Sequence, residues 1–269
     1  MKRVALTALL LLSFFPLNAA AQQNFAGQQQ TGSTTNSTVQ PVMTPLQLAE
    51  MRADILMARK LYPEAVSSYE HVLKQEPKNA VLLNKTGVAC EVWGQNGCAE
   101  KYFKKAMKAD KQYASPFNNL GTVEYVRKHY KNAIKWYSES LQLHMDTPAT
   151  VYMNLGYAYF ADKQYPEAMS SFQQAITIDP TVFQRPGGFG SIVEERSTTD
   201  PGLFYFFVAR TYAQLGDAER AAHYLKMARD DGYKKYDSAK TDPAFSRVIS
   251  DPQVQRVFST VPELARKPN

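Results

Sequence analysis

The chain has 269 residues, of which 44% are hydrophobic and 21% are charged, as in an ordinary globular protein. Its formal net charge is +6, but acidic and basic residues are interleaved and form no concentrated basic stripe, so we expect no nucleic acid among its partners. The four histidines are scattered without the spacing of metal ligands. We therefore expect no metal site, no catalytic residues and no cofactor.

Residues 1–21 have the three parts of a secretory signal peptide. Lys2 and Arg3 form a basic start, residues 4–15 are an uncharged and mostly apolar run, and residues 19–21 are alanines at the expected cleavage site. The run is too short to cross a bilayer of about 30 Å as a helix, and no cysteine follows it to carry a lipid anchor. We expect cleavage after Ala21, a periplasmic or secreted protein, and a mature chain with a charge of +4 and no transmembrane segment.

Residues 22–44 are expected to form a disordered tether. The segment has no charged residue and consists mostly of Gln, Thr, Ser, Asn and Gly. Such a sequence cannot bury enough apolar surface to offset the entropy lost on ordering. Order should begin at Thr44 and Pro45, because threonine caps helices well and proline suits the first helical position.

From residue 46 onward the chain repeats a pattern of small and aromatic residues. Gly87, Gly121 and Gly156 are separated by 34 and 35 residues. An alanine stands 12 residues after each of these glycines, at Ala99, Ala133 and Ala168, and Ala65 continues the series one repeat earlier. An aromatic residue follows each alanine by four residues: Tyr69, Phe103, Tyr137 and Phe172. This spacing predicts pairs of short antiparallel helices that approach closely at the small residues, with each aromatic side chain filling the space between one hairpin and the next. A single hairpin cannot bury its apolar face, so several must stack.

These spacings resemble the tetratricopeptide repeat family over about residues 46–233. The fourth repeat matches the family signature throughout, at Tyr152, Leu155, Gly156, Tyr159, Ala168, Phe172, Ala175 and Pro180. The other repeats depart from it, for example with Cys90 and Glu124 where the signature has tyrosine. The resemblance implies an all-α fold, namely a right-handed superhelical solenoid of about five helical hairpins with a C-terminal helical cap.

Two segments differ from a plain array. Residues 45–180 contain repeats one to four and residues 203–233 contain repeat five, so residues 181–202 are a Gly- and Pro-containing insert. In the C-terminal segment 234–269, aspartate–proline pairs predict short helices at 243–249 and 252–259. Their apolar side chains should pack on the last repeat as a cap: Phe245, Val248, Ile249, Val254, Val257 and Phe258.

The family resemblance also implies a groove lined by the first helix of each repeat. Glu50, Met51, Asp54 and Glu91 take such positions. The residues that we expect to contact a peptide or protein partner are Asn84, Lys85, Asn118, Asn119, Tyr125, Met153, Asn154, Tyr157, Phe160, Phe206, Phe207 and Arg210. A carboxamide can pair with both the N–H and the C=O of an extended peptide. Bonds between the asparagines and their own neighbours are an equal alternative.

Phe206 and Phe207 would form an unusual apolar patch if they faced water. We expect residues 186–193 of the insert to fold over them, as a fixed wall or as a lid hinged at its glycines. Met153, Asn154, Tyr157 and Phe160 would then form an open strip that faces the ligand.

Cys90 and Cys98 are predicted near the facing ends of two helices of one hairpin, and export would place them in an oxidising compartment. A disulfide and a pair of free thiols are both compatible with this placement.

Taken with the resemblance, the sequence predicts a non-enzymatic scaffold in the bacterial cell envelope that binds a protein or peptide. One alternative is a structural component that associates with copies of itself. A second is an enzyme whose site lies within residues 181–202.

Overall fold

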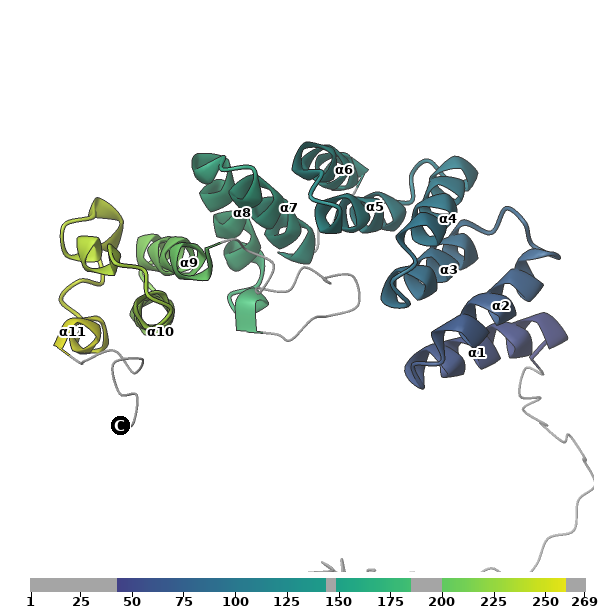
Figure 1. Cartoon of the computed structure of the whole chain (residues 1–269), viewed down its shortest axis with the longest axis horizontal. Coiled ribbons are helices and arrows are strands. Elements are labelled where there is room, and N and C mark those ends of the chain that lie inside the picture. Colours follow the sequence, from purple (N-terminus) through teal and green to yellow (C-terminus); the bar gives the residue numbers. More distant parts are fainter. Residues whose placement is uncertain (1–42, 144–148, 185–199, 260–269) are drawn as a thin grey trace, which may run out of the picture. The chain divides into compact units, whose positions relative to one another are not determined.

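The computed structural model describes residues 43–143, 149–184 and 200–259, and these residues form α-helices and short 3₁₀ helices without any strand (Figure 1). The α-helices are α1 Pro45–Ala58, α2 Tyr62–Leu73, α3 Ala80–Val92, α4 Asn96–Ala109, α5 Ser115–Val126, α6 Tyr130–Leu143, α7 Ala149–Ala161, α8 Tyr165–Ile178, α9 Pro201–Leu215, α10 Ala218–Asp230 and α11 Pro252–Ser259. The 3₁₀ helices are η1 Val182–Gln184, η3 Tyr236–Lys240 and η4 Pro243–Phe245. The all-α prediction is confirmed. None of the described helices is long and apolar enough to span a membrane.

The first hairpin begins where the sequence predicts, and all five hairpins turn in the same way. The first helix starts at Thr44, whose side chain accepts a hydrogen bond from the backbone N–H of Gln47, and the Gln47 side chain accepts one from Thr44 in return. Between the two helices of a hairpin, one residue adopts a left-handed conformation. These residues are Lys60, Gly94, Lys128, Lys163 and Gly216, with φ of 60, 80, 64, 62 and 82°. The same tight turn therefore closes all five hairpins.

The small residue of the first helix and the aromatic residue of the second meet within one hairpin. A Cβ added to Gly87 would lie 2.4 Å from a ring atom of Phe103, and one added to Gly121 would lie 2.6 Å from a ring atom of Tyr137. The sequence predicts close approach at these glycines, and the structure agrees. It differs in placing each ring against the glycine of its own hairpin, because only there is a Cβ missing.

Successive hairpins pack through alternate helices: α3 lies on α2, α5 on α4, α7 on α6, and α9 on α8. The buried side chains form one apolar cluster from α1 to α5 and another from α5 to α11. The core therefore runs along the stack instead of gathering at one centre, as expected for a repeat protein.

The C-terminal segment covers the last hairpin, with α11 on α10 and η4 on α9. Of its six predicted cap residues, four are buried in the core cluster and two are partly buried against it. The α11 helix spans the predicted residues 252–259, but the predicted helix at 243–249 is only the three-residue η4. The chain there follows i to i+3 hydrogen bonds, such as that from Phe245 N to the Asp242 carbonyl, so it tightens into turns.

Several expectations concern residues outside the described ranges. They are the signal peptide, almost all of the tether, the C-terminal tail, and the part of the insert expected to form a lid.

Candidate functional site

Four asparagines on the first helices α3, α5 and α7 form one hydrogen-bonded row. Asn119 Nδ2 donates to Asn84 Oδ1 at 3.0 Å, and Asn118 Nδ2 donates to Asn119 Oδ1 at 3.1 Å. Asn154 Nδ2 donates to Asn118 Oδ1 at 3.2 Å. The row connects repeats two, three and four, and all four residues are largely buried.

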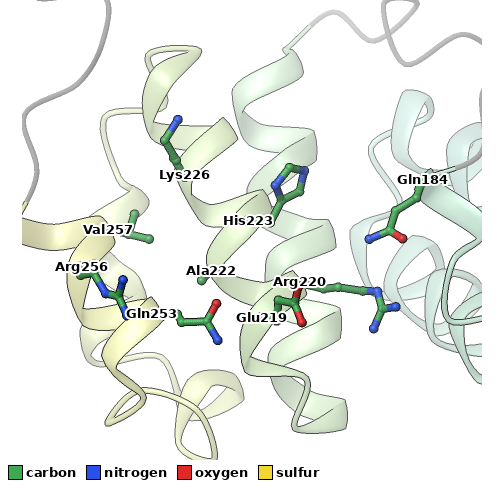
Figure 2. Close-up of a pocket in the computed structure, with 9 residues that line it drawn as sticks. All are labelled: Gln184, Glu219, Arg220, Ala222, His223, Lys226, Gln253, Arg256 and Val257. Atoms are coloured by element: carbon green, nitrogen blue, oxygen red, sulfur yellow. The ribbon is translucent and has the colours of Figure 1, made fainter.

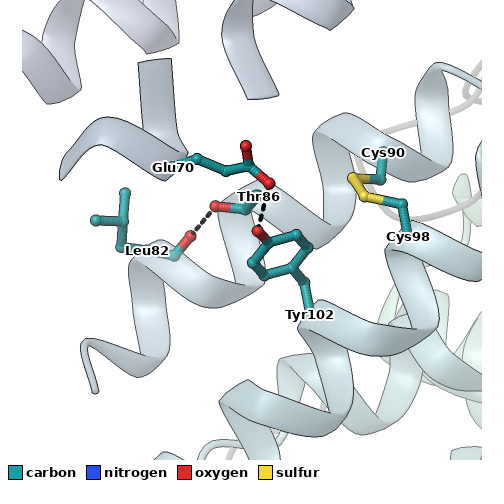
Figure 3. Close-up of a disulfide and its surroundings, with 6 residues drawn as sticks. All are labelled: Glu70, Leu82, Thr86, Cys90, Cys98 and Tyr102. Carbon is teal, nitrogen blue, oxygen red and sulfur yellow. Dashed lines mark hydrogen bonds between the residues drawn. A yellow bond between two sulfur atoms is a disulfide. The ribbon is translucent and has the colours of Figure 1, made fainter. Parts of the chain in front are cut away.

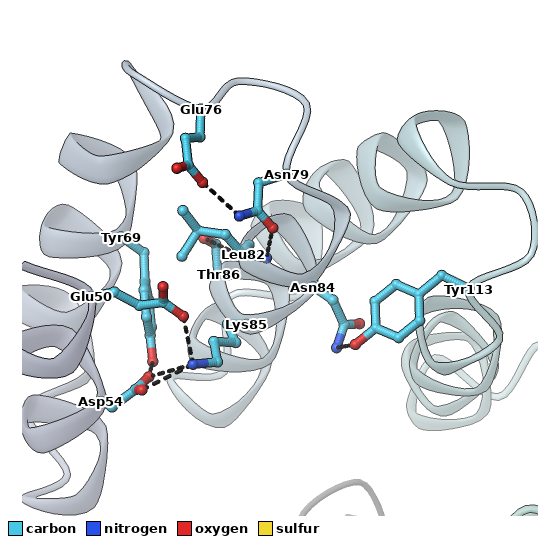
Figure 4. A network of polar contacts seen from close by, with 10 residues as sticks. All are labelled: Glu50, Asp54, Tyr69, Glu76, Asn79, Leu82, Asn84, Lys85, Thr86 and Tyr113. Atoms are coloured by element: carbon cyan, nitrogen blue, oxygen red, sulfur yellow. Dashed lines mark hydrogen bonds and ion pairs between the residues drawn. The ribbon is translucent and has the colours of Figure 1, made fainter. Parts of the chain in front are cut away.

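The row has a polar extension at each side of Asn84 (Figure 4). Asn84 Nδ2 donates to the hydroxyl of Tyr113, at 3.4 Å, from the segment that joins α4 to α5. Its neighbour Lys85 reaches back to the first repeat, where its Nζ lies 2.8 Å from Glu50 Oε1 and 2.9 Å from Asp54 Oδ2. Nothing in the repeat signature marks Tyr113, and sequence reasoning did not include it in the site.

The carboxylates of Glu50 and Asp54 and the ammonium of Lys85 together leave one unbalanced negative charge at the first-repeat end of the row. Burial lowers the pKa of Lys85, but its hydrogen bonds to Glu50 and Asp54 outweigh burial and hold the pKa above the ordinary value. Asp54 also accepts a hydrogen bond from the hydroxyl of Tyr69. Burial and the acidic neighbours raise the pKa of Tyr69, so the phenol stays protonated.

These contacts follow a repeating rule. Lys85 bonds to Glu50, Asn119 bonds to Asn84, and Asn154 bonds to Asn118, across 35, 35 and 36 residues. In each case one first helix reaches back to the first helix of the preceding repeat. The structure thus shows the asparagines bonded to their own neighbours, and the row fixes how one repeat lies on the next.

The predicted open strip is not open. Met153, Asn154, Tyr157 and Phe160 are all buried. The ring of Phe204 in α9 stacks on Tyr157 with centroids 5.0 Å apart and meets Phe160 edge-on at 5.6 Å. The aromatic members of the strip are therefore core residues between repeats four and five, since α9 supplies a matching aromatic face.

Tyr125 is buried as well, with its ring 5.4 Å from that of Tyr130. Phe206 is covered by the last residue of repeat five and by the C-terminal segment, its ring lying 5.0 Å from Tyr233 and 6.0 Å from Phe245. We expected residues 186–193 to provide the cover, but most of the insert lies outside the described residues. The cap already shields Phe206, because η4 packs on α9.

Phe207 and Arg210, the last two predicted contact residues, line a pocket of about 590 Å³ between α8 and α9. Phe207 stacks on Tyr165 with centroids 5.0 Å apart. The guanidinium of Arg210 lies 3.0 Å from the sulfur of Met169 and 2.8 Å from Asp242 Oδ2. Asp242 neutralises Arg210, so the pocket has no free positive charge from this residue. What it offers a ligand is mainly the aromatic wall of Phe207 and Tyr165.

A second pocket, of about 490 Å³, lies between α10 and α11 (Figure 2). Basic side chains dominate its lining, but Arg220 pairs with Asp217 and Lys226 pairs with Asp230. Glu219 adds a further carboxylate to the wall. These pairings leave little unbalanced charge to attract an anion.

Cys90 in α3 and Cys98 in α4 form a disulfide, with their Cα atoms 5.6 Å apart (Figure 3). One repeat later the same two positions hold Glu124 and Asn132, and Asn132 Nδ2 donates to Glu124 Oε2 at 2.9 Å. Burial raises the pKa of Glu124, but hydrogen bonds from Asn132, His129 and Arg127 outweigh it and lower the pKa overall. A covalent bond in one repeat and a charged hydrogen bond in the next thus join the same ends of the two helices.

Glu91, beside Cys90 on α3, is a carboxylic acid with a strongly raised pKa. Burial raises the pKa of Glu91 to about 8. The acid therefore exchanges its proton near neutral pH. Among the described residues, no group of three His, Cys, Asp or Glu side chains could hold a metal ion.

Paired antiparallel helices that stack hairpin upon hairpin define a helical-repeat solenoid. Residues 149–182, which contain α7 and α8, match the model of the tetratricopeptide repeat family. By this match, α7 and α8 form a tetratricopeptide repeat, and the stacked hairpins of the described residues have the fold that the spacings predict.

The relatives match different lengths of the chain. It is 29% identical over 159 residues to the DnaJ homolog subfamily C member 7 homolog of Schizosaccharomyces pombe, across 54% of this chain and 33% of the relative. It is 24% identical over 222 residues to the Hsp70-Hsp90 organizing protein of Triticum aestivum, across 77% of this chain and 36% of the relative. The chain spans about a third or less of the length of the curated relatives it matches. The crystal structure of PilW, a type IV pilus biogenesis factor, shares the fold at 17% identity and a TM-score of 0.53, over 81% of this chain and 100% of that chain.

Proposed function

We propose that the chain is a non-enzymatic scaffold that binds a peptide or another protein along the first helices of its repeats. The observation that carries this proposal is the asparagine row of α3, α5 and α7, with Lys85 and Tyr113 beside it. One curated relative has a name that describes the organisation of two other proteins, which supports the same class of role.

The row retains hydrogen-bonding capacity for a partner. A carboxamide has two N–H donors and two acceptor lone pairs. Asn119 uses one N–H toward Asn84 and accepts one bond from Asn118. It therefore keeps one donor and one acceptor, the pair that an extended peptide backbone needs. Lys85, Phe207 and Arg210 are partly exposed and would supply side-chain contacts, whereas the buried aromatic and apolar members of the predicted set would shape the surface from beneath.

Site-specific photo-crosslinking tests the partner surface. A benzophenone residue at Tyr113, which borders the row, should capture a partner in living cells, whereas one at the exposed Gln174 on α8 should not. Lys85→Glu should weaken the capture at position 113 because it reverses the charge next to the row. Lys131→Glu, at an exposed position on α6, is the matched control. Equal capture at both positions, or none at position 113, would count against the proposal.

We also propose that this scaffold works in the bacterial cell envelope, on the evidence of the signal sequence at residues 1–21. N-terminal sequencing of the protein from an envelope fraction should begin near residue 22. Envelope material that begins at Met1 would contradict this assignment without bearing on the partner surface.

A further inference from the structure

The outward face of α1 carries an apolar stripe. Leu48, Met51 and Ile55 are 47, 42 and 43% exposed. Their spacing of three and then four residues places them on one face of the helix. Single exposed apolar side chains are ordinary, but a contiguous row marks a surface that another element covers.

The equivalent positions in the later repeats show what kind of element covers the stripe. The residues equivalent to Leu48 and Ile55 are buried in every later first helix that follows α1 up to α7: Leu82 and Ala89 in α3, Pro116 and Val123 in α5, and Val151 and Ala158 in α7. Each of these helices packs on the second helix of the hairpin before it. The stripe of α1 is therefore the surface by which repeats stack, and in the described residues no hairpin precedes it.

The middle position distinguishes α1 from the other first helices. Lys85, Asn119 and Asn154 occupy it in repeats two to four, and each bonds to a polar side chain of the preceding repeat. In α1 the same position is Met51. Met51 calls for an apolar counterpart, whereas the equivalent residues of the later repeats bond to polar side chains. The surface that covers the α1 stripe therefore differs from that of an ordinary preceding repeat.

The opposite end of the stack is closed. Val254 and Val257 of the cap are buried, and η4 and α11 cover α9 and α10. In the part of the chain that the structure describes, only the α1 end offers such a stripe, which disfavours stacking of one copy head to tail on another. Contact between two equal surfaces gives a closed twofold dimer.

Charges on the two edges of the stripe determine how the helices run. Arg52 and Arg59 are exposed on one edge. On the other edge Glu50 and Asp54 share the single charge of Lys85, which leaves a net negative charge. In a parallel pair of α1 helices, the positive edge of each copy faces the negative edge of the other, whereas an antiparallel pair would bring like edges together.

We propose that two copies of this chain associate through α1, with the helices parallel and the stripe of Leu48, Met51 and Ile55 meeting its equivalent across a twofold axis. Arg52 then lies near Asp54 of the partner subunit. One helix per copy buries less than the roughly 800 Å² per partner of a stable complex, so the dimer should be weak, with a Kd in the micromolar range or above. This inference is independent of the proposed partner surface.

Sedimentation velocity over a range of concentrations tests the dimer. The purified protein should pass from monomer to dimer, and Leu48→Asp with Ile55→Asp should raise the Kd at least about tenfold, because it buries four unpaired charges. Val81→Asp with Val126→Asp is the control, since these residues are 50 and 49% exposed elsewhere. Both variants should retain the helical circular dichroism of the parent. A monomer at every concentration up to about 1 mM, or equal effects of the two variants, would overturn the proposal.

Crosslinking tests the orientation, with the Cys90–Cys98 disulfide left intact. Met51→Cys and Leu48→Cys should each give a covalent dimer with a short thiol-reactive linker, whereas Val126→Cys should not. If Leu48→Cys reacts only with Ile55→Cys of a second copy, the parallel arrangement is wrong. If Met51→Cys forms no more dimer than Val126→Cys, the α1 interface itself is wrong.

Discussion

The ring of Phe172 in α8 lies directly against Gly156 in α7, where an added Cβ would be only 2.3 Å from Cε1 of the ring. The same relationship joins Gly121 with Tyr137 in the preceding hairpin. The rings are fully buried and rigid, so neither can move aside at low cost. This contact makes the signature glycine a packing requirement and not a demand of backbone conformation.

Gly156→Ala should therefore destabilise the protein although alanine is the better helix former. Overpacking of this kind costs about 1–3 kcal/mol, which exceeds the gain of up to about 1 kcal/mol in helix propensity. Urea unfolding followed by circular dichroism measures the difference. Gly97→Ala in α4 is the control, because a Cβ there meets nothing within 4 Å and should be neutral or stabilising. Stabilisation by Gly156→Ala would contradict the contact.

Reduction of the Cys90–Cys98 disulfide should lower stability. The bridge closes a short loop within one hairpin, and loops of this length contribute up to about 2–3 kcal/mol. Thermal unfolding with and without a reductant tests this on the purified protein. Cys90→Ala with Cys98→Ala should show no response to the reductant. Mass spectrometry that finds both thiols free without reductant would show that the bridge does not form.

Asn119→Leu should loosen the stack between repeats two and three. The change leaves Asn84 Oδ1 and Asn118 Nδ2 without their partner in a largely buried setting, at a cost of about 1–3 kcal/mol. Urea unfolding should show this loss, and hydrogen exchange should increase first in α3 and α5. Gln174→Leu, at an exposed position of α8, should change stability by less than about 0.5 kcal/mol. If both changes alter stability equally, the asparagine row does not hold repeats two and three in position on each other.

Glu91 should make stability fall as pH rises. Its pKa is raised by burial from 4.5 to about 8, so the folded protein holds a proton that the unfolded chain releases. With respect to this group, stability is greatest below pH 4.5 and is lost as the pH rises to about 8. Glu91→Gln removes this loss and should stabilise the protein at pH 9 by at least about 1 kcal/mol, with little effect at pH 4.

Unfolding of both proteins across this pH range, with the exposed Glu64→Gln as the control, checks the prediction. A constant difference between Glu91→Gln and the parent at all pH values would show that Glu91 titrates normally.

The sequence alone determined that the chain forms helical hairpins and how many residues each hairpin contains. Residues equivalent to Gly156, Ala168 and Phe172 recur with a period of 34 or 35 residues, and that spacing is typical of two short helices that pack closely. Thr44 and Pro252 likewise marked helix starts, because capping depends on residues that are adjacent in the chain. These are local rules, and the structure bears them out.

Only the tertiary structure decided which first-helix residues are covered. Asn154 bonds to Asn118 across 36 residues, and Tyr157 stacks on Phe204 beyond the insert. Phe206 is shielded by Phe245 from the cap. Helical periodicity shows which side chains share a face, but burial depends on which distant element packs there. For the same reason, only comparison with the buried Ala89 and Val123 shows that the exposed Ile55 occupies a stacking position.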